Sequence, residues 1–445
     1  MTYRVAKSKV KNAMKLSHQL HLTDSDNAML NGADGEALQF AMLVVVRAAS
    51  VMGAAQLTDV SFVHIDACHY YGRAHLDFAQ FFLDHNARFK IPAWTNTIPV
   101  SLKPDQETRG DANVLALREA RELARLYVDL GSNPVWTCAP YQLPNGPQFG
   151  DNIVVGESNA VSYYNSAVGA RTNKYSDFLD VCAGLTGRAP LAGLHTDEGR
   201  RASIVFDVSE IPLQMRQTEL FCHVLGIVMG QHAANRVPVV CGLPSETPGD
   251  SLKALAAAGA SSGGITMYHA VGVTPEANSL AQATGGVEPQ LYIKVSPQML
   301  IDARNLLSPV IEGELSMVAV GTPHFSISEF ERAVKIFNGR KIRSDMTFYI
   351  STSRFVANLV RERGWYESLV QSGVSILEDT CTYFSPAVRA AQGRVMTNSA
   401  KWAYYAPGML PVEVAFGSLD ECIESAVSGY VVRDPILWSN DMWGL

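Results

Sequence analysis

Short segments with the apolar pattern of buried β-strands recur along the chain, and segments with helical spacing lie between them. The strand-like segments include "SIVFDVSEIP" (203–212), "VPVVCGLP" (237–244) and "SMVAVGTPHFS" (316–326), and the last is followed by the helix-like "ISEFERAVKIF" (327–337). Strands that alternate with helices in this way predict an α/β fold with mostly parallel sheets flanked by helices. Ligands of such sheets bind beyond the carboxyl ends of the strands, so we looked for reactive groups in the strand-end loops.

The length of the chain predicts more than one domain. The chain has 445 residues, of which 47% are hydrophobic and 18% charged, and domains contain about 100–200 residues each. We expect an N-terminal α/β region over residues 1–215 and a C-terminal α/β region over residues 216–445. The small-residue stretch "AAAGASSGG" (256–264) is typical either of a linker or of a tightly packed helix end.

Charge, hydropathy and cysteine usage narrow the class of protein. The net charge is −7, so the chain lacks the excess of basic residues that would indicate a nucleic-acid partner. The apolar stretch "FAMLVVVRAASVMGAA" (40–55) is interrupted by Arg47 and is too short to span a bilayer. The seven cysteines are scattered without a CxxC pair, which favours a reducing compartment. We therefore expect a cytoplasmic protein without a membrane partner.

Three cysteines fall in loops at predicted strand ends. Cys68 lies in "HIDACHYYG" (64–72), Cys138 in "WTCAPYQ" (136–142) and Cys381 in "EDTC" (378–381). Thiolates at separate strand ends can converge in space, and their soft sulfur atoms suit zinc or an iron–sulfur cluster. The alternative is that all three are ordinary core residues, because free cysteine is among the most buried side chains.

The segment "GESNAVSYYNSAVGARTN" (156–173) predicts a helix that forms a pocket wall. Asn159, Ser162 and Ser166 recur at the spacing of one helix face, among small neighbours. Arg171, at the end of the segment, is suited to clamp a carboxylate through two parallel hydrogen bonds. The alternative is a helix packed against a neighbour, with Arg171 in an ordinary salt bridge. The candidate substrate-binding residues of the segment are Glu157, Ser158, Asn159, Ser166, Arg171 and Thr172.

A second candidate segment is "MTNSAKWAYYAPG" (396–408). It places Asn398 as a further substrate-binding candidate and puts the hydroxyl of Ser399 two residues before the ammonium of Lys401. The alternative is that Asn398 or Ser399 caps the start of a helix.

These segments resemble the catalytic (large) subunit of the aconitase X family, a branch of the aconitase superfamily. The resemblance is carried by "LTDSDNAMLNGADGEALQFAM" (22–42), "TCAPYQLPNGPQFGDN" (137–152), "ESNAVSYYNSAVGARTN" (157–173), "GTPHFS" (321–326), "EDTC" (378–381) and "MTNSAKWAYYAPGMLPVEVAFGSLDECIESAVSG" (396–429). They extend over nearly the whole chain. The resemblance implies an aconitase-like multi-domain architecture and a hydro-lyase that uses an iron–sulfur cluster to remove water from a small hydroxy acid.

The resemblance also implies a substrate. One branch of the family dehydrates cis-3-hydroxy-L-proline to pyrroline-2-carboxylate with a [2Fe–2S] cluster, and the other dehydrates mevalonate 5-phosphate with a larger one. The phosphomevalonate branch carries cysteine where this chain has Thr322 and lacks a cysteine at the position of Cys68. Both differences favour the hydroxyproline branch and a [2Fe–2S] cluster over a [3Fe–4S] or [4Fe–4S] cluster. The alternatives are a mevalonate 5-phosphate dehydratase and a cluster-free binding or regulatory homologue.

Site roles and a partner follow from the same resemblance. Cys68, Cys138 and Cys381 are the expected cluster ligands. Ser399 is the expected catalytic base, because aconitases use a serine alkoxide, and Lys401 is expected to lower its pKa. The family also needs a small swivelling domain, which we expect to come as a separate subunit because this chain has no room for it.

Overall fold

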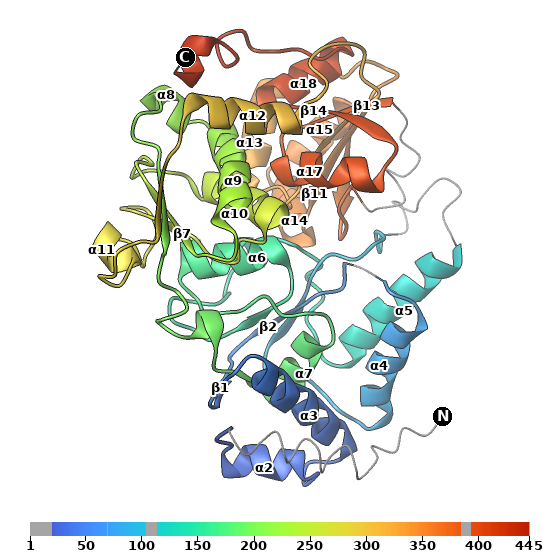
Figure 1. Ribbon diagram of the computed structural model, residues 1–445. Coiled ribbons are helices and arrows are strands. Elements are labelled where there is room, and N and C mark those ends of the chain that lie inside the picture. The colour runs from blue at the N-terminus through green and yellow to red at the C-terminus, as the bar shows by residue number, and fades with distance from the viewer. Residues whose placement is uncertain (1–19, 69, 104–113, 384–392, 445) are drawn as a thin grey trace.

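The computed structural model describes residues 20–68, 70–103, 114–383 and 393–444. The strands within these ranges form four sheets, of which the three larger ones are wholly parallel. The predicted α/β class is therefore confirmed. Figure 1 shows the N-terminal elements at the bottom, the middle of the chain at the upper left and most C-terminal elements at the upper right, while the chain ends at the upper left. No helix in the described ranges is long and apolar enough to cross a membrane.

The N-terminal part is built around a parallel sheet in the order β3-β2-β4 and an antiparallel pair of β1 and β5. Its strands are β1 (Leu57–Asp59), β2 (Val63–Ile65), β3 (Ala93–Thr95), β4 (Val154–Val155) and β5 (Arg188–Pro190). Its helices are α2 (Asp24–Leu30), α3 (Glu36–Val51), α4 (Arg73–Asp84), α5 (Val114–Asp129), η3 (Pro140–Gln142), α6 (Ser158–Tyr163), the π-helical η4 (Tyr164–Val168), α7 (Leu179–Thr186) and η5 (Gly193–His195). The apolar stretch around Arg47 thus belongs to the largely buried helix α3.

The middle part contains a parallel sheet in the order β8-β7-β6-β9. Its strands are β6 (Ile204–Asp207), β7 (Pro238–Cys241), β8 (His269–Ala270) and β9 (Leu291–Lys294), and its helices are α8 (Leu213–Arg216), α9 (Glu219–Ala233), α10 (Gly249–Gly263), α11 (Leu280–Ala283) and α12 (Pro297–Leu307). The predicted boundary at residue 215 lies inside this sheet, because β6 precedes it and the other three strands follow it. The sheets therefore group the chain differently from the two predicted regions, whose division into domains stays a prediction.

The C-terminal part contains a parallel sheet in the order β12-β11-β10-β13-β14. Its strands are β10 (Met317–Val320), β11 (Thr347–Thr352), β12 (Val374–Glu378), β13 (Gly393–Thr397) and β14 (Val412–Phe416). Its helices are α13 (Ile327–Phe337), α14 (Arg354–Glu362), α15 (Trp365–Gln371), α17 (Ala400–Met409), α18 (Leu419–Ser428) and α19 (Asn440–Trp443). Helix α13 begins at a capping box in which Ser326 and Glu329 satisfy each other's backbone amides, so its start follows directly from the sequence.

Helix α10 joins the three parts, because it packs against α9, α6 and α17. The small residues at its end allow a close approach to α9. A Cβ atom at Gly226 of α9 would lie 2.5 Å from the Cβ of Ala258, closer than real Cβ atoms approach. The stretch 256–264 is therefore a tightly packed helix end, and the linker alternative is wrong.

Candidate active site

Loops from two sheets meet at the carboxyl ends of their strands. The amide of Ile98, after β3, donates to the carbonyl of Asp379, after β12, at 3.0 Å. The amide of Thr137 donates to the carbonyl of Thr95 at 3.2 Å, which places Cys138 beside the end of β3. Cys138 and Cys381 therefore approach each other although they belong to different parts of the fold.

The two thiols are buried and face each other. The Sγ atoms of Cys138 and Cys381 lie 3.8 Å apart, and the two residues are 3% and 2% exposed. The amide of His324 donates to the Cys138 sulfur at 3.3 Å. The neighbouring Cys138 thiol, together with burial, raises the pKa of Cys381 well above its usual range. A cation between the sulfurs would reverse this effect, since thiolates are the form that binds metals.

His324 holds Thr137 and Thr380, the residues that directly precede the two cysteines. Its Nε2 donates to the carbonyl of Thr380 at 3.1 Å, and the hydroxyl of Thr137 donates to its Nδ1 at 3.0 Å. Burial lowers the pKa of His324 to about 4, so the ring is neutral at pH 7. One ligand atom each of His324 and the two cysteines lies within 4.8 Å of the others, but both ring nitrogens are already engaged. The ring therefore acts as a support for the thiols. Loop 321–326 is one of the segments that carry the family resemblance, but His324 was not among the predicted site residues.

Cys68 lies at the edge of the same site. It follows β2, packs against the core cluster that contains the other two cysteines, and lines a cavity of about 710 Å³. Burial and the adjacent Asp66 raise the pKa of the Cys68 thiol well above its usual range, while the Lys401 ammonium acts in the opposite direction. Among the described residues, Cys68 is not part of the tight group of two thiols and the histidine.

A buried ion pair forms part of the cavity wall. The Lys401 ammonium donates to Oε1 of Glu157 at 2.5 Å, and the side chains are 4% and 6% exposed. The other carboxylate oxygen of Glu157 accepts from the amide of Ala160 at 2.7 Å and caps helix α6. Burial by itself lowers the pKa of Lys401, but Glu157 and neighbouring groups outweigh it and hold the pKa well above its usual range. The site therefore contains a permanent, fixed ammonium.

The rest of the cavity wall combines acidic, basic and aromatic side chains. Ser158, a predicted substrate-binding residue, lies on this wall and is half-buried. The sequence analysis did not name several other lining residues, which are Asp66, Tyr71, Lys174, Tyr175, Ser176, Asp177, Phe178, Tyr383, Tyr405 and Met409.

Three predicted binding residues are buried and do not line the cavity. Asn159 donates to the carbonyl of Cys138 at 2.9 Å and accepts from the hydroxyl of Tyr141 at 2.7 Å. Ser166 accepts from the amide of Tyr268 at 2.8 Å. Thr172 donates to the carbonyl of Asn173 at 2.7 Å. Their side chains are thus engaged within the protein, and a substrate-binding role for the three residues stays a prediction.

The remaining predicted residues lie away from the cavity wall. Arg171 forms an ion pair with Asp197 at 2.5 Å and donates to the carbonyl of His195 at 3.2 Å. Ser399 caps helix α17 by accepting from the amide of Trp402 at 3.1 Å, and its hydroxyl donates to the carbonyl of Thr322. Asn398 is buried beside it at the end of β13. Arg171 and Ser399 thus make the contacts of the structural alternatives, and their roles as clamp and base stay predictions.

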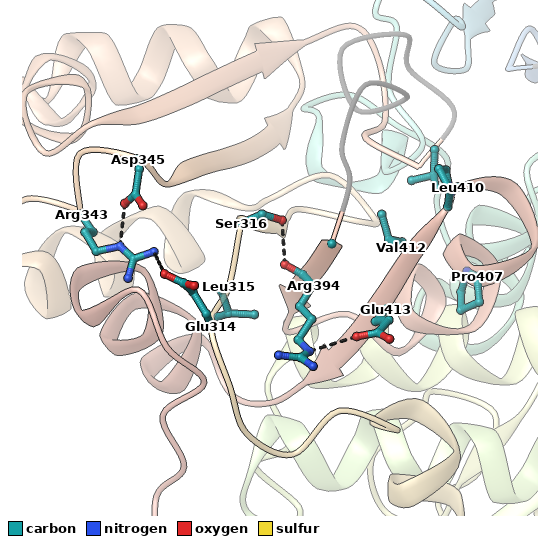
Figure 2. Close-up of a pocket in the computed structure, with 12 residues that line it drawn as sticks. Glu314, Leu315, Ser316, Arg343, Asp345, Arg394, Pro407, Leu410, Val412 and Glu413 are labelled. Atoms are coloured by element: carbon teal, nitrogen blue, oxygen red, sulfur yellow. Dashed lines mark hydrogen bonds and ion pairs between the residues drawn. The ribbon is translucent and has the colours of Figure 1, made fainter.

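A larger cavity of about 890 Å³ lies at the opposite edge of the five-stranded sheet, near the amino ends of β10, β13 and β14. Figure 2 shows that its charged side chains are turned toward one another. Arg343 pairs with Glu314 at 2.9 Å and with Asp345 at 2.6 Å, and Arg394 pairs with Glu413 at 3.0 Å. Because parallel sheets bind ligands at the carboxyl edge, we assign the active site to the smaller cavity.

Comparison with known proteins finds matches over most of the chain. Family models match over three segments: the aconitase X first domain over residues 19–198, the second domain over 202–305 and the third domain over 315–428. The solved structure of Thermococcus kodakaraensis aconitase X in its holo form superposes with a TM-score of 0.81 at 28% identity, and the match covers 92% of this chain and 100% of that chain.

Two kinds of dehydratase are similar in sequence. Cis-3-hydroxy-L-proline dehydratase of Pseudomonas aeruginosa is 41% identical over 91% of this chain and 69% of its own length, and that of Hypocrea jecorina is 38% identical over 93% and 70%. The phosphomevalonate dehydratase large subunit of Methanosarcina mazei is 31% identical over 92% of this chain and 98% of its own length. The matches to the family models, the relatives and the solved structure show that this chain belongs to the aconitase X family.

Proposed function

We propose that this chain is the catalytic subunit of an iron–sulfur hydro-lyase that removes water from cis-3-hydroxy-L-proline. The observation that carries this proposal is the buried pair of thiols of Cys138 and Cys381, 3.8 Å apart, beside a cavity lined by Cys68 and the Lys401–Glu157 pair. The two relatives named for this reaction are 41% and 38% identical.

The thiols fit an iron–sulfur cluster. Sulfur donors are soft ligands that select such clusters, and two buried thiols that face each other are best satisfied by a shared cation. Cys138 and Cys381 would hold the cluster, and Cys68 is the candidate third ligand at its open side. When bound, a cluster with an open iron position supplies a Lewis acid for the leaving hydroxyl group. We propose the [2Fe–2S] type, as in the hydroxyproline branch.

The side chains of this chain would serve the other half of the elimination. A proton leaves the carbon next to the substrate carboxylate, and hydroxide leaves the neighbouring carbon. The fixed Lys401 ammonium would offset the negative charge that develops at the carbon that loses its proton. Oε1 of Glu157 is the candidate acceptor of the proton within the cavity. The Ser399 hydroxyl is a weaker candidate, because it already donates to Thr322. The enamine product then tautomerises to pyrroline-2-carboxylate.

The charges of the cavity favour an amino acid over a phosphorylated acid. Its lining includes Lys174 and Lys401 as cations and Asp66, Glu157 and Asp177 as acids. The acids on this lining outnumber the cations, so a phosphate dianion would meet mostly negative charge. The mevalonate 5-phosphate reaction is therefore the second candidate.

A small subunit would complete the site. Tyr71 and Met409 line the cavity, yet their exposed fractions are 64% and 44%. Exposed apolar side chains beside a site are common at interfaces, and the relatives of the phosphomevalonate type are named large subunits. We also propose a cytoplasmic location, because the seven cysteines are free thiols and the cytosol keeps thiols reduced.

The test is anaerobic purification with and without a candidate small subunit, followed by assays of iron, sulfide and turnover. We expect iron and sulfide in equal amounts, the absorbance spectrum of a [2Fe–2S] cluster, and dehydration of cis-3-hydroxy-L-proline that requires the small subunit. Preferential turnover of mevalonate 5-phosphate would establish the second candidate. An iron-free protein without either activity after cluster reconstitution would favour the cluster-free homologue.

A further inference from the structure

The stretch 174–178 forms one wall of the cavity that contains Cys68 and Lys401. All five of its residues line the cavity. The stretch is anchored at its start by Tyr175, whose amide donates to the carbonyl of Val155 at 3.2 Å and whose hydroxyl donates to Nε2 of His195 at 2.7 Å. At its end it leads directly into helix α7.

Lys174 and Asp177 are a basic and an acidic residue on this wall, and neither pairs with another charged side chain of the described residues. Throughout the described ranges, no ion pair involves either side chain, and the carboxylate of Asp177 is hydrogen-bonded only to its own backbone amide. Lys174 is exposed at the rim, and Asp177 is half-buried. Lys401 and Glu157 behave differently, because their side chains form an ion pair with each other at 2.5 Å.

The backbone next to Asp177 is held in an unusual conformation. Phe178 has φ of +75°, a left-handed value that is rare for a bulky residue. Its ring packs against His75 and Phe78, with centroid separations of 4.9 and 4.7 Å. Such outliers persist where packing enforces them, and they cluster at functional sites. The aromatic packing therefore fixes the direction in which the neighbouring carboxylate projects.

An unpartnered carboxylate in this position needs a cation. Burial and nearby Asp66 raise the pKa of Asp177 to about 7, because its charged form has little compensation. A ligand ammonium would supply that compensation through a charge-assisted hydrogen bond. A ligand with a phosphate group would bring further negative charge and would not.

We propose that Asp177 binds the ring ammonium of a proline-type substrate, with Lys174 receiving the substrate carboxylate at the cavity rim. This inference rests on the proposed function and adds the residue that selects amino acids over acids without a nitrogen. The ligand class is a cyclic α-amino acid in its zwitterionic form.

The experiment compares two ligands that differ only at the ring nitrogen, L-proline and cyclopentanecarboxylate. Both are measured as inhibitors of the assembled enzyme and by calorimetry. Asp177→Asn keeps the shape of the side chain and removes its charge. We expect this variant to bind L-proline about 10- to 100-fold more weakly, the loss of one charge-assisted hydrogen bond, and cyclopentanecarboxylate within about 2-fold of wild type. The KM for cis-3-hydroxy-L-proline should rise more than kcat falls.

Asp34→Asn is the matched control, because Asp34 is exposed between α2 and α3 and its replacement changes the net charge equally. This control should leave both affinities unchanged.

Equal weakening of both ligands by Asp177→Asn would overturn the inference, as would wild-type protein that does not bind L-proline. If the wild-type enzyme turns over hydroxyproline and Asp177→Asn binds L-proline normally, the inference fails while the proposed function stands. If L-proline binding depends on Asp177 but no turnover is found, the function fails and the inference stands.

Discussion

The two cavities differ in how their charges are used. At the amino edge of the five-stranded sheet, Arg394 and Glu413 pair with exposed fractions of 42% and 64%, so water shares the interaction. At the carboxyl edge, Lys401 and Glu157 pair with exposed fractions of 4% and 6%, next to two buried thiols and the unpartnered Asp177. Among the described residues, the charges of the larger cavity pair with one another, whereas the smaller cavity retains Asp177 and Lys174 without an ion pair. Volume alone would favour the larger cavity, whereas the pattern of charges favours the smaller one.

The largest expected effect comes from the thiols. Replacing Cys138 or Cys381 by serine exchanges a soft donor for a hard one, so we expect iron content to fall to background and turnover to fall by at least about 100-fold. Iron assay and steady-state kinetics measure this. Cys241→Ser is the control, because Cys241 ends β7 and is only half-buried. Full iron loading of both Cys138→Ser and Cys381→Ser would disprove the assignment of the cluster to this cavity.

The next prediction compares how much the buried Lys401–Glu157 pair and the exposed Arg394–Glu413 pair contribute to stability. Lys401→Met leaves the Glu157 carboxylate buried without a partner and should destabilise the protein by about 3–5 kcal/mol. Arg394→Met removes an exposed pair and should cost at most about 1 kcal/mol. Urea unfolding of the apoprotein compares the two, and adding Glu157→Gln to Lys401→Met should restore part of the loss. Equal costs for the two single variants would remove the distinction between the cavities.

A pH-dependent contrast is expected at His75, whose ring packs against Phe178 of the cavity wall. Burial lowers the pKa of His75 to about 4, against about 6.5 in the unfolded chain. The unfolded state therefore binds the extra proton between these values, and the contribution of neutral His75 is present above pH 6.5 and lost as pH falls toward 4. The stability difference between wild type and His75→Gln should shrink by about 1–2 kcal/mol from pH 7.5 to pH 5.

Gln80→Ala is the control for this measurement, because Gln80 lies on the same helix and its side chain does not titrate. Its difference from wild type should change little over the same pH range. A stability difference for His75→Gln that does not depend on pH would show that the ring is not held neutral by the fold.

The smallest expected effect concerns Ser399. Because the structure shows it capping helix α17, Ser399→Ala should cost about 1 kcal/mol of stability and should lower turnover by less than about 10-fold, the equivalent of 1.4 kcal/mol. Glu157→Gln should lower turnover about 100-fold or more, as expected for loss of a general base. Steady-state kinetics of the two variants at equal iron content show which residue is the catalytic base. A much larger loss for Ser399→Ala would return the base role to the serine.

The sequence predicted the elements better than the contacts between them. The strand-end positions of the cysteines could be found, because strand periodicity and loop composition are local properties of the sequence. The pairing of Lys401 with Glu157 could not, since the two residues are 244 positions apart. Arg171 suited a carboxylate clamp, but Asp197, 26 positions further along the chain, pairs with it in the structure. The charges of Lys174 and Asp177 were overlooked because charged residues in a loop are usually solvated.

The separation of the two thiols along the chain has a consequence for assembly. Cys138 and Cys381 are 243 positions apart, so the pair does not exist until the sheets that carry them have come together. A cluster held by both would act as a cross-link that closes this long loop. In chain-entropy terms, closing a loop of this size restricts the unfolded state by about 5 kcal/mol. Insertion of the cluster should therefore follow folding, and once inserted it should slow the separation of the N-terminal and C-terminal parts of the molecule.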